Sequence, residues 1–265
     1  MSQEHRTNRE QAAWLIKFWD VQAEHNRERK QGVYALMHVK SGHKVLDIGC
    51  GPGTDTLPLA QIVGPKGQVI GIDLKEENIA EANKRAESAG VSDWLEHKVG
   101  DASALPFADG YFDACHAERV FMHLPNSEDV FAELVRVTHS GGWIAIIDFD
   151  WGSLSIDTPE VDIERRISAF MGGIHRNPYA GRQLYRLFRN HGLVDTSLDA
   201  EPLVFTDLAA AEFLLRLGER PGKAFEAGWI TQEELVRFRA SLEQADAAGA
   251  FYCSMNRVTV VGCKP

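Results

Sequence analysis

The residues best suited to chemistry are an acid and three glycines around the end of a short apolar run. Asp47 lies within the run 45–48, and Gly49, Gly51 and Gly53 follow it. Because glycine has no Cβ, such a turn lets a ligand approach the backbone closely. A dinucleotide fingerprint would have its third glycine at position 54, where this sequence has Thr54. The turn predicts a ligand site that does not follow the dinucleotide pattern.

Two acids indicate what that ligand carries. A carboxylate inside an apolar strand is costly unless a cation or a hydrogen bond compensates it, and a ligand ammonium group would compensate Asp47. A pyrophosphate there would be repelled. Asp73 ends the next apolar run, 20 residues after Gly53, where an acid commonly binds ribose hydroxyls. The pair predicts a nucleoside that bears an amine.

These residues resemble the class I S-adenosylmethionine-dependent methyltransferases. The resemblance covers about residues 39–148 and extends to the small-molecule enzymes similar to those of quinone and natural-product biosynthesis. Further motifs that match this family are Gly100-Asp101-Ala102, Leu105-Pro106-Phe107, Tyr111-Phe112-Asp113 and Ser140-Gly141-Gly142-Trp143. The resemblance implies S-adenosylmethionine as cofactor, S-adenosylhomocysteine as product, and no metal.

The same resemblance implies a role for each matching residue. The methionine part would be held by Asp47 and by the loop Gly49, Cys50, Gly51, Pro52 and Gly53. Asp73 would bind the ribose, and Leu74 would pack on the adenine. Asp101 would accept a hydrogen bond from the adenine amino group, with the Ala102 backbone facing the ring. Arg119 would touch the cofactor or the substrate.

The methyl acceptor would lie beyond the carboxyl ends of the strands, where open α/β sheets bind their ligands. His123 is the candidate general base, since a neutral imidazole can take a proton near pH 7; bracing the following helix is the alternative role. The other candidates for contact with the acceptor are Trp19, Asp148, Asp150, Trp151, Tyr179, Arg182, Phe251 and Tyr252. Strand termination and core packing would explain most of them equally well.

Short apolar strands alternate with amphipathic helices, which predicts a doubly wound α/β sheet. We expect strands at 44–48, 68–72, 95–99, 111–116, 143–148, 193–205 and 257–263, and helices at 8–29, 32–39, 54–63, 76–89 and 127–139. Thr158-Pro159 and Thr231-x-x-Glu234 have the form of helix starts. The resemblance adds the strand order 3-2-1-4-5-7-6, with the seventh strand antiparallel. We therefore expect a helical lid at 1–40 and a domain at 41–265, with acceptor-pocket insertions near 152–190 and 206–250.

The composition narrows the range of partners. The 265 residues carry a formal net charge of −10, which disfavours nucleic acid as a partner. Arg27, Arg29 and Lys30 form a basic cluster that we interpret as a solvated helix face. No apolar stretch approaches the length of a membrane span and the start of the chain is polar, so a cytoplasmic location without membrane contact is expected. A homodimer remains an option.

Neither the cysteine spacing nor the histidine and acid pattern of this sequence indicates a metal site. The four cysteines show no zinc-like pairing, and His116-Ala117-Glu118 has the H-x-E form of a zinc deaminase without its companion cysteines. Two other functions stay open, an NAD-dependent dehydrogenase and a non-catalytic module that binds S-adenosylmethionine. The acceptor, and whether O, N or C is methylated, are left open by the sequence.

Overall fold

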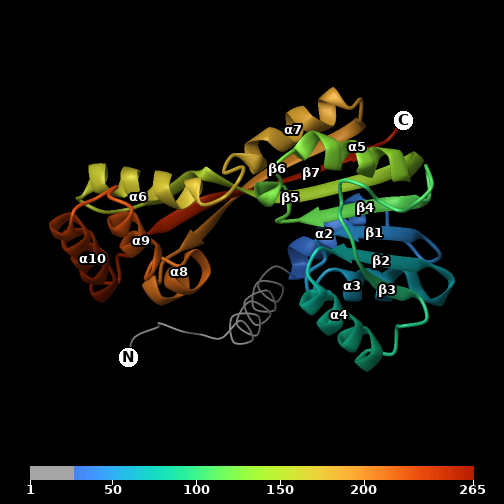
Figure 1. Ribbon diagram of the computed structural model, residues 1–265, viewed down its shortest axis with the longest axis horizontal. Helices are drawn as coiled ribbons and strands as arrows, with labels where there is room; N and C mark the ends of the chain where they lie inside the picture. Colours follow the sequence, from blue (N-terminus) through green and yellow to red (C-terminus); the bar gives the residue numbers. More distant parts are fainter. Residues whose placement is uncertain (1–26) are drawn as a thin grey trace.

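A computed structural model describes residues 27–265, and a seven-stranded sheet is its centre (Figure 1). The strands are β1 (Lys44–Ile48), β2 (Gln68–Asp73), β3 (Leu95–Val99), β4 (Phe112–Glu118), β5 (Thr138–Ile156), β6 (Val194–Phe205) and β7 (Cys253–Cys263). Their order is β3-β2-β1-β4-β5-β7-β6. Strands β1 to β5 pair in parallel, and β7 is antiparallel to β5 and β6. The predicted fold class and strand order are confirmed.

Helices cover the sheet on both faces. Helices α2 (Arg27–Leu36), α3 (Thr56–Val63) and α4 (Glu76–Ser88) lie on one face, and α5 (Ser127–Val137) and α7 (Ala180–Asn190) on the other (Figure 1). Neighbouring strand residues point to opposite faces, so Val45 packs in the α2 and α3 layer while Leu46 packs towards α5 and α7. This alternation decides which face each polar strand residue reaches.

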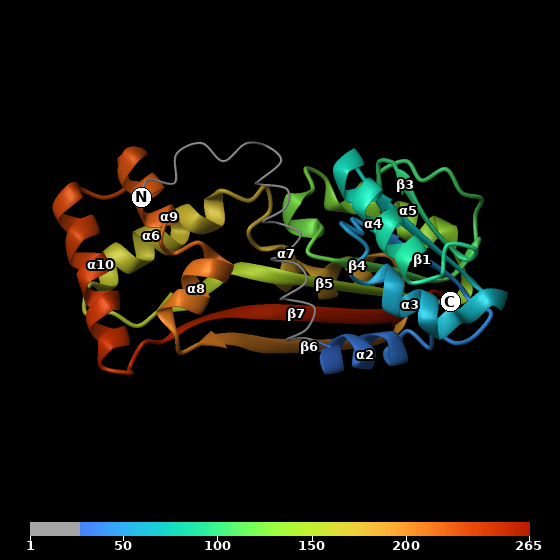
Figure 2. The ribbon, with the colours of Figure 1, turned by 90° about the horizontal axis from the view of Figure 1, so that it is seen from below.

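Strands β5, β6 and β7 are longer than the other four strands of the sheet. β5 was expected to end near Asp148, but it continues to Ile156 and still pairs with β7 there. Leu154, Ile156 and Met255 are buried in the main core, so the extension is built on apolar contacts. Figures 1 and 2 show the long strands leading from the α/β body to a separate group of helices, which we call the cap. The cap consists of α6 (Val161–Gly173), α8 (Leu208–Leu215), α9 (Arg220–Glu226) and α10 (Gln232–Ala247).

The predicted helix starts had different outcomes. Thr231 caps α10 in a complete capping box with Glu234, as expected. Thr158-Pro159 does not start α6, which begins at Val161. Thr158 instead hydrogen bonds to Ser241 of α10 at 2.7 Å, so its hydroxyl ties the cap together.

Two further expectations concern the helical lid and the first insertion. The helical lid lies mostly outside the described residues, as does Trp19. The 152–190 insertion includes α7, which packs on β5 and β7 of the body rather than in the cap (Figure 1). No helix within residues 27–265 combines the length and apolar character needed to cross a membrane.

Candidate active site

The glycine turn after β1 is built from left-handed backbone. Gly49, Gly51 and Gly53 have φ values of 62°, 54° and 84°, which favour glycine. A Cβ at Gly49 would come within 2.4 Å of the Val120 side chain, so this glycine also lets β1 pack against the segment after β4. The buried Cys50 amide donates to the Ile72 carbonyl at 3.1 Å, which fixes the turn to the end of β2.

Asp73 at the end of β2 holds the same turn. Its carboxylate accepts hydrogen bonds from the amides of Gly51 and Lys75, each at 2.9 Å, and from the Asn78 side chain at 3.0 Å. A carboxylate has about four acceptor positions, so these three bonds leave room for at least one more. Asp73 therefore joins the two predicted cofactor motifs and keeps some acceptor capacity.

The third predicted acid lies beside Asp73. The Gly100 amide donates to the Asp73 carbonyl at 3.0 Å, which places the end of β3 next to the end of β2. Asp101 is exposed there and accepts from the Ser103 amide at 2.9 Å and the Ser103 hydroxyl at 2.8 Å, and these bonds lower its pKa. Leu74 is 70% exposed and Ala102 is half-buried. An exposed apolar side chain directly after Asp73 fits a surface that receives a flat apolar ring.

Asp47 already has a partner within the protein. It is only 2% exposed and accepts a hydrogen bond from Nδ1 of His116 on β4 at 2.8 Å. Burial raises the pKa of Asp47 to about 6, against the lowering effect of the His116 hydrogen bond. Burial lowers the pKa of His116, but Asp47 outweighs it and the net shift is upward. Asp47 and His116 are thus mutually stabilised, and burial of Asp47 does not by itself require a ligand cation.

Lys30 is not on a solvated face, which corrects the interpretation of the basic cluster. It is 8% exposed, and its ammonium lies 2.7 Å from both carboxylate oxygens of Asp55 and 3.0 Å from Glu118. Tyr34, one helical turn along α2, also donates to Asp55, at 2.5 Å. Arg29 donates to Glu118 at 3.0 Å. Helix α2 is therefore fastened by buried charge to the glycine turn and to the end of β4.

Glu118 shows the electrostatic effect of these contacts. Burial alone would raise its pKa, but Lys30 and Arg29 hold the pKa well below its usual range. The pKa of Lys30 is raised, because the attraction of Asp55 and Glu118 exceeds the opposing effect of burial. Lys30 and Glu118 are therefore both charged at neutral pH.

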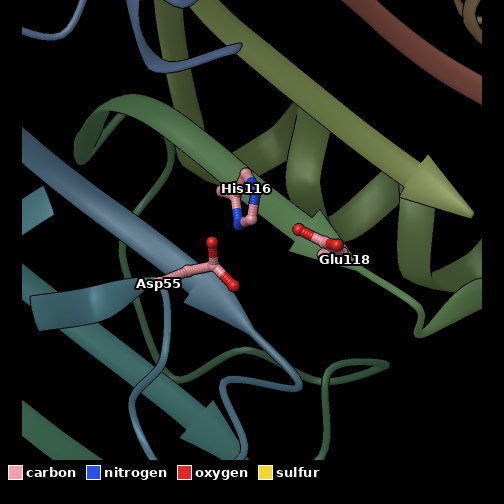
Figure 3. A group of neighbouring side chains, drawn as sticks. All are labelled: Asp55, His116 and Glu118. Carbon is pink, nitrogen blue, oxygen red and sulfur yellow. The ribbon is translucent and has the colours of Figure 1, made fainter. Parts of the chain in front are cut away.

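Figure 3 shows that Asp55, His116 and Glu118 point towards one another, in a grouping that a metal ion could use. Lys30 contacts both carboxylates and His116 bonds to Asp47, so the ligand atoms are engaged by the protein's own groups. The absence of a metal requirement stays a prediction. The H-x-E spacing at 116–118 was a usable signal, because residues two apart on a strand share a face.

His123 belongs to a short 3-10 helix, η2 (Phe121–His123), just after β4. Asp148 at the end of the central part of β5 is fully buried and accepts from the Met122 amide at 3.0 Å, which holds η2 in place. Burial raises the pKa of Asp148 to about 7. Asp148 therefore holds the segment that carries His123, and its contact with the acceptor stays a prediction.

His123 itself is exposed and has a lowered pKa. The largest cause of the lowered pKa is that the protein removes part of the ring from water. The charges of Arg119, Lys75 and Arg220 lower the pKa further. Arg119 has a left-handed backbone with φ of 59° and donates its amide to the Ile147 carbonyl at 2.8 Å. Lys75 follows β2 and Arg220 begins α9 of the cap, so charges from both parts of the structure act on His123.

A stack of side chains faces His123. The ring of His175, from the loop between α6 and α7, is 5.5 Å from the His123 ring and lies stacked at 4.5 Å on Trp151. The Arg220 guanidinium at the start of α9 is 4.7 Å from the Trp151 ring. Trp151 is buried, and both groups contact its ring. The sequence singled out His123 and Trp151 and missed His175 and Arg220.

The remaining predicted acceptor residues form other groups. Asp150 accepts from Arg182 at 2.7 Å, and the Arg182 guanidinium lies 5.0 Å from the ring of Tyr179. These three residues join β5 to α7. Phe251 and Tyr252 precede β7 at its cap end, where the Tyr252 carbonyl accepts from the Asp157 amide. They lie near the end of β5 at Ile156, apart from the glycine turn after β1.

A surface hollow lies near the start of α5 and α7, next to the segments that carry His123 and His175. It is lined by residues that include Phe121, Leu124, Asn126, Arg176, Asn177 and Leu187. None of the predicted site residues lines it. The site is therefore assigned from its chemistry and from the strand ends.

Comparison with known proteins gives the family. A family model described as a methyltransferase domain matches residues 39–190. An uncharacterized 37.1 kDa protein in transposon TN4556 of Streptomyces fradiae is 34% identical over 89% of this chain and 66% of its own length. The 2-phytyl-1,4-naphtoquinone methyltransferase of Synechococcus elongatus is 41% identical over 41% of this chain and 47% of its own. This chain therefore spans about half to two thirds of these relatives.

A solved structure supports the fold and widens its range of chemistry. The structure of the [4+2]-cyclase SpnF has a TM-score of 0.59 and 23% identity, covering 90% of this chain and 81% of its own. At that identity the similarity concerns the fold alone. A protein with this architecture is thus described as a cyclase, so the reaction must be argued from the site residues.

Proposed function

Because the chain belongs to the methyltransferase-domain family of S-adenosylmethionine-dependent enzymes, we propose that it transfers a methyl group from S-adenosylmethionine to a small organic molecule. The observation that carries the proposal is the hydrogen bond from the Gly51 amide to Asp73, since it makes the glycine turn and the second-strand acid one preformed site. The acceptor atom, whether O, N or C, is left open. A quinone-like or secondary-metabolite acceptor is the class that the naphtoquinone-methylating relative suggests.

The residues at this edge fit a nucleoside joined to an amino acid. Asp73 retains acceptor capacity for a ribose hydroxyl, and the exposed Leu74 can pack on a base. The Thr54 hydroxyl is buried, and within residues 27–265 it has no hydrogen-bond partner. Nε and Nη1 of Arg29 are also buried without a partner in the described part of the chain. We assign the amino acid end of the ligand to the side of the turn where these unused groups lie.

The chemistry asks little of the protein beyond positioning and proton removal. S-adenosylmethionine supplies a methyl group on a positively charged sulfur, which becomes the neutral thioether of S-adenosylhomocysteine. The protein holds the acceptor in line with that methyl group. Where the acceptor carries an O–H or N–H, His123 takes the proton, and Asp148 keeps η2 in position through the Met122 amide.

We predict that His123→Ala lowers kcat by about 10²- to 10⁴-fold, the usual contribution of a general base, and leaves cofactor affinity unchanged. Because the pKa of His123 is lowered from its usual value of 6.5, the imidazole is still mostly neutral at pH 6.5. The acid limb of the kcat/KM profile should therefore lie below that pH. The measurement is S-adenosylhomocysteine release against pH, with His191→Ala, directly after α7, as a matched control. Full activity of His123→Ala with an O–H acceptor would remove His123 from the reaction.

The dehydrogenase and the non-catalytic module are distinguished by two assays. Calorimetric titration should show binding of S-adenosylhomocysteine and none of NADH; the reverse result would support the dehydrogenase. Incubation with methyl-labelled S-adenosylmethionine and a pool of small-molecule acceptors should then yield a labelled product. Tight binding with no labelled product from any acceptor would support the non-catalytic module.

A further inference from the structure

The side of the site that faces the cap carries the guanidinium of Arg220. Glu219, next to Arg220 in sequence, is bound by Arg216 and at 2.5 Å by Lys223. No ion pair joins Arg220 to a carboxylate within residues 27–265. Burial is also the main reason that its pKa falls to about 10. A largely buried guanidinium of this kind is costly until an anion reaches it.

Unused hydrogen-bonding atoms lie in the same place. Nη1 of Arg220 and Nε2 of His175 are buried, and neither has a hydrogen-bond partner in the part of the chain that the structure describes. The protein around the ring and the charge of Arg220 lower the pKa of His175 to about 3, so this ring is neutral at pH 7 and can donate one N–H. Within the described residues, Arg220 and His175 thus form a wall with two unsatisfied donors, which a native protein rarely keeps without use.

Hydrogen bonds connect this wall to η2 and to β5. Trp151 supports both groups, and its own indole N–H is directed at the Met122 sulfur at 3.4 Å. The Asn177 amide donates to the Met122 carbonyl at 3.0 Å, and the Trp151 amide donates to the Pro178 carbonyl at 2.8 Å. The loop that carries His175 is therefore bound to η2 and to β5. Trp151 is a positioning residue and does not itself face the acceptor.

Resting on the proposed function, we propose that Arg220 and His175 bind an anionic oxygen group of the methyl acceptor, so that the acceptor is an organic acid. A carboxylate oxygen can accept from the guanidinium and from the imidazole together. His123 lies 5.5 Å from His175, ring centre to ring centre, which leaves the nucleophilic atom of a bound acid near the candidate base. A phosphate monoester presents the same chemistry and is distinguished in the test.

The test uses calorimetric titration of the protein loaded with S-adenosylhomocysteine. The probes are benzoate and 1-naphthoate, each with its neutral amide, and 1-naphthyl phosphate. At least one acid should bind about 10- to 150-fold more tightly than its amide, as expected for hydrogen bonds to a charged group. The Arg220→Gln variant should lose this preference and keep its affinity for S-adenosylhomocysteine. The matched control is Arg237→Gln, an exposed cap arginine that bonds to Glu160 and should retain the preference.

Several outcomes would overturn the inference. They are equal binding of acids and amides, no binding of any acid, or an unchanged preference in Arg220→Gln. If that variant does not fold, as judged by circular dichroism, Arg220→Lys and His175→Gln replace it, with partial and substantial loss of the preference expected. Preference for the phosphate over 1-naphthoate would assign the acid as a phosphate ester. Failure to bind S-adenosylhomocysteine would instead contradict the proposed function, while an Arg220-dependent acid preference measured without it would leave the inference standing.

Discussion

Lys30→Met should destabilise the protein by about 3 kcal/mol, the lower end of the range for removing one partner of a buried ion pair. The substitution keeps most of the side-chain volume and removes the ammonium that lies between Asp55 and Glu118. Tyr34 and Arg29 remain bonded to those carboxylates, which limits the loss. The free energy of unfolding, measured by denaturant titration, checks the prediction.

Two comparison variants make this result specific to buried charge. Lys40→Met, at an exposed position shortly after α2, should change the free energy of unfolding by less than about 0.5 kcal/mol. Adding Asp55→Asn to Lys30→Met should recover part of the loss, because within residues 27–265 Asp55 then keeps only the neutral Tyr34 hydroxyl as a side-chain partner and its uncompensated charge is removed. A loss below about 1 kcal/mol in Lys30→Met would show that Lys30 is solvated in solution.

Asp73→Ala should weaken binding of S-adenosylhomocysteine by about 1–3 kcal/mol, or roughly 6- to 150-fold. The substitution removes the acceptor for a ribose hydroxyl and also releases the Gly51 amide that fixes the glycine turn. Calorimetric affinity is the readout, and a thermal melt separates lost binding from lost folding.

The control for Asp73→Ala is Asp93→Ala, an exposed acid between α4 and β3. Asp93→Ala should bind S-adenosylhomocysteine with wild-type affinity. An unchanged affinity in Asp73→Ala would reject its ribose role and leave it as a structural bond to the glycine turn.

The body of the fold could be predicted from the sequence because its signals are local. Apolar runs mark β1, β2 and β4, and the turn after β1 needs glycine at positions with positive φ. The strand order followed from resemblance. The extension of β5 could not be read locally, since residues 149–156 mix one acid, one glycine and two serines with apolar residues. They stay in a strand through pairing with β7 and through apolar contacts. Propensity is overruled there by tertiary structure.

The residues of the site could be predicted only where they belong to a sequence motif. Asp73 ends β2 and Asp101 follows the end of the neighbouring β3, as their positions in the sequence implied. Lys30 looked like part of a charged helix face, and its burial depends on Asp55 and Glu118, which lie 25 and 88 residues further along the chain. His175 and Arg220 come from separate loops and helices that converge on Trp151. Partners brought together only by the folded chain have no signature in one sequence.

A structure of the protein crystallised with S-adenosylhomocysteine is the measurement closest to the central claim. The account predicts the ribose at Asp73, the amino acid end over Gly49 to Gly53, and the sulfur directed towards His123 and the cap. A nucleoside bound elsewhere, or a sulfur turned away from His123, would contradict it.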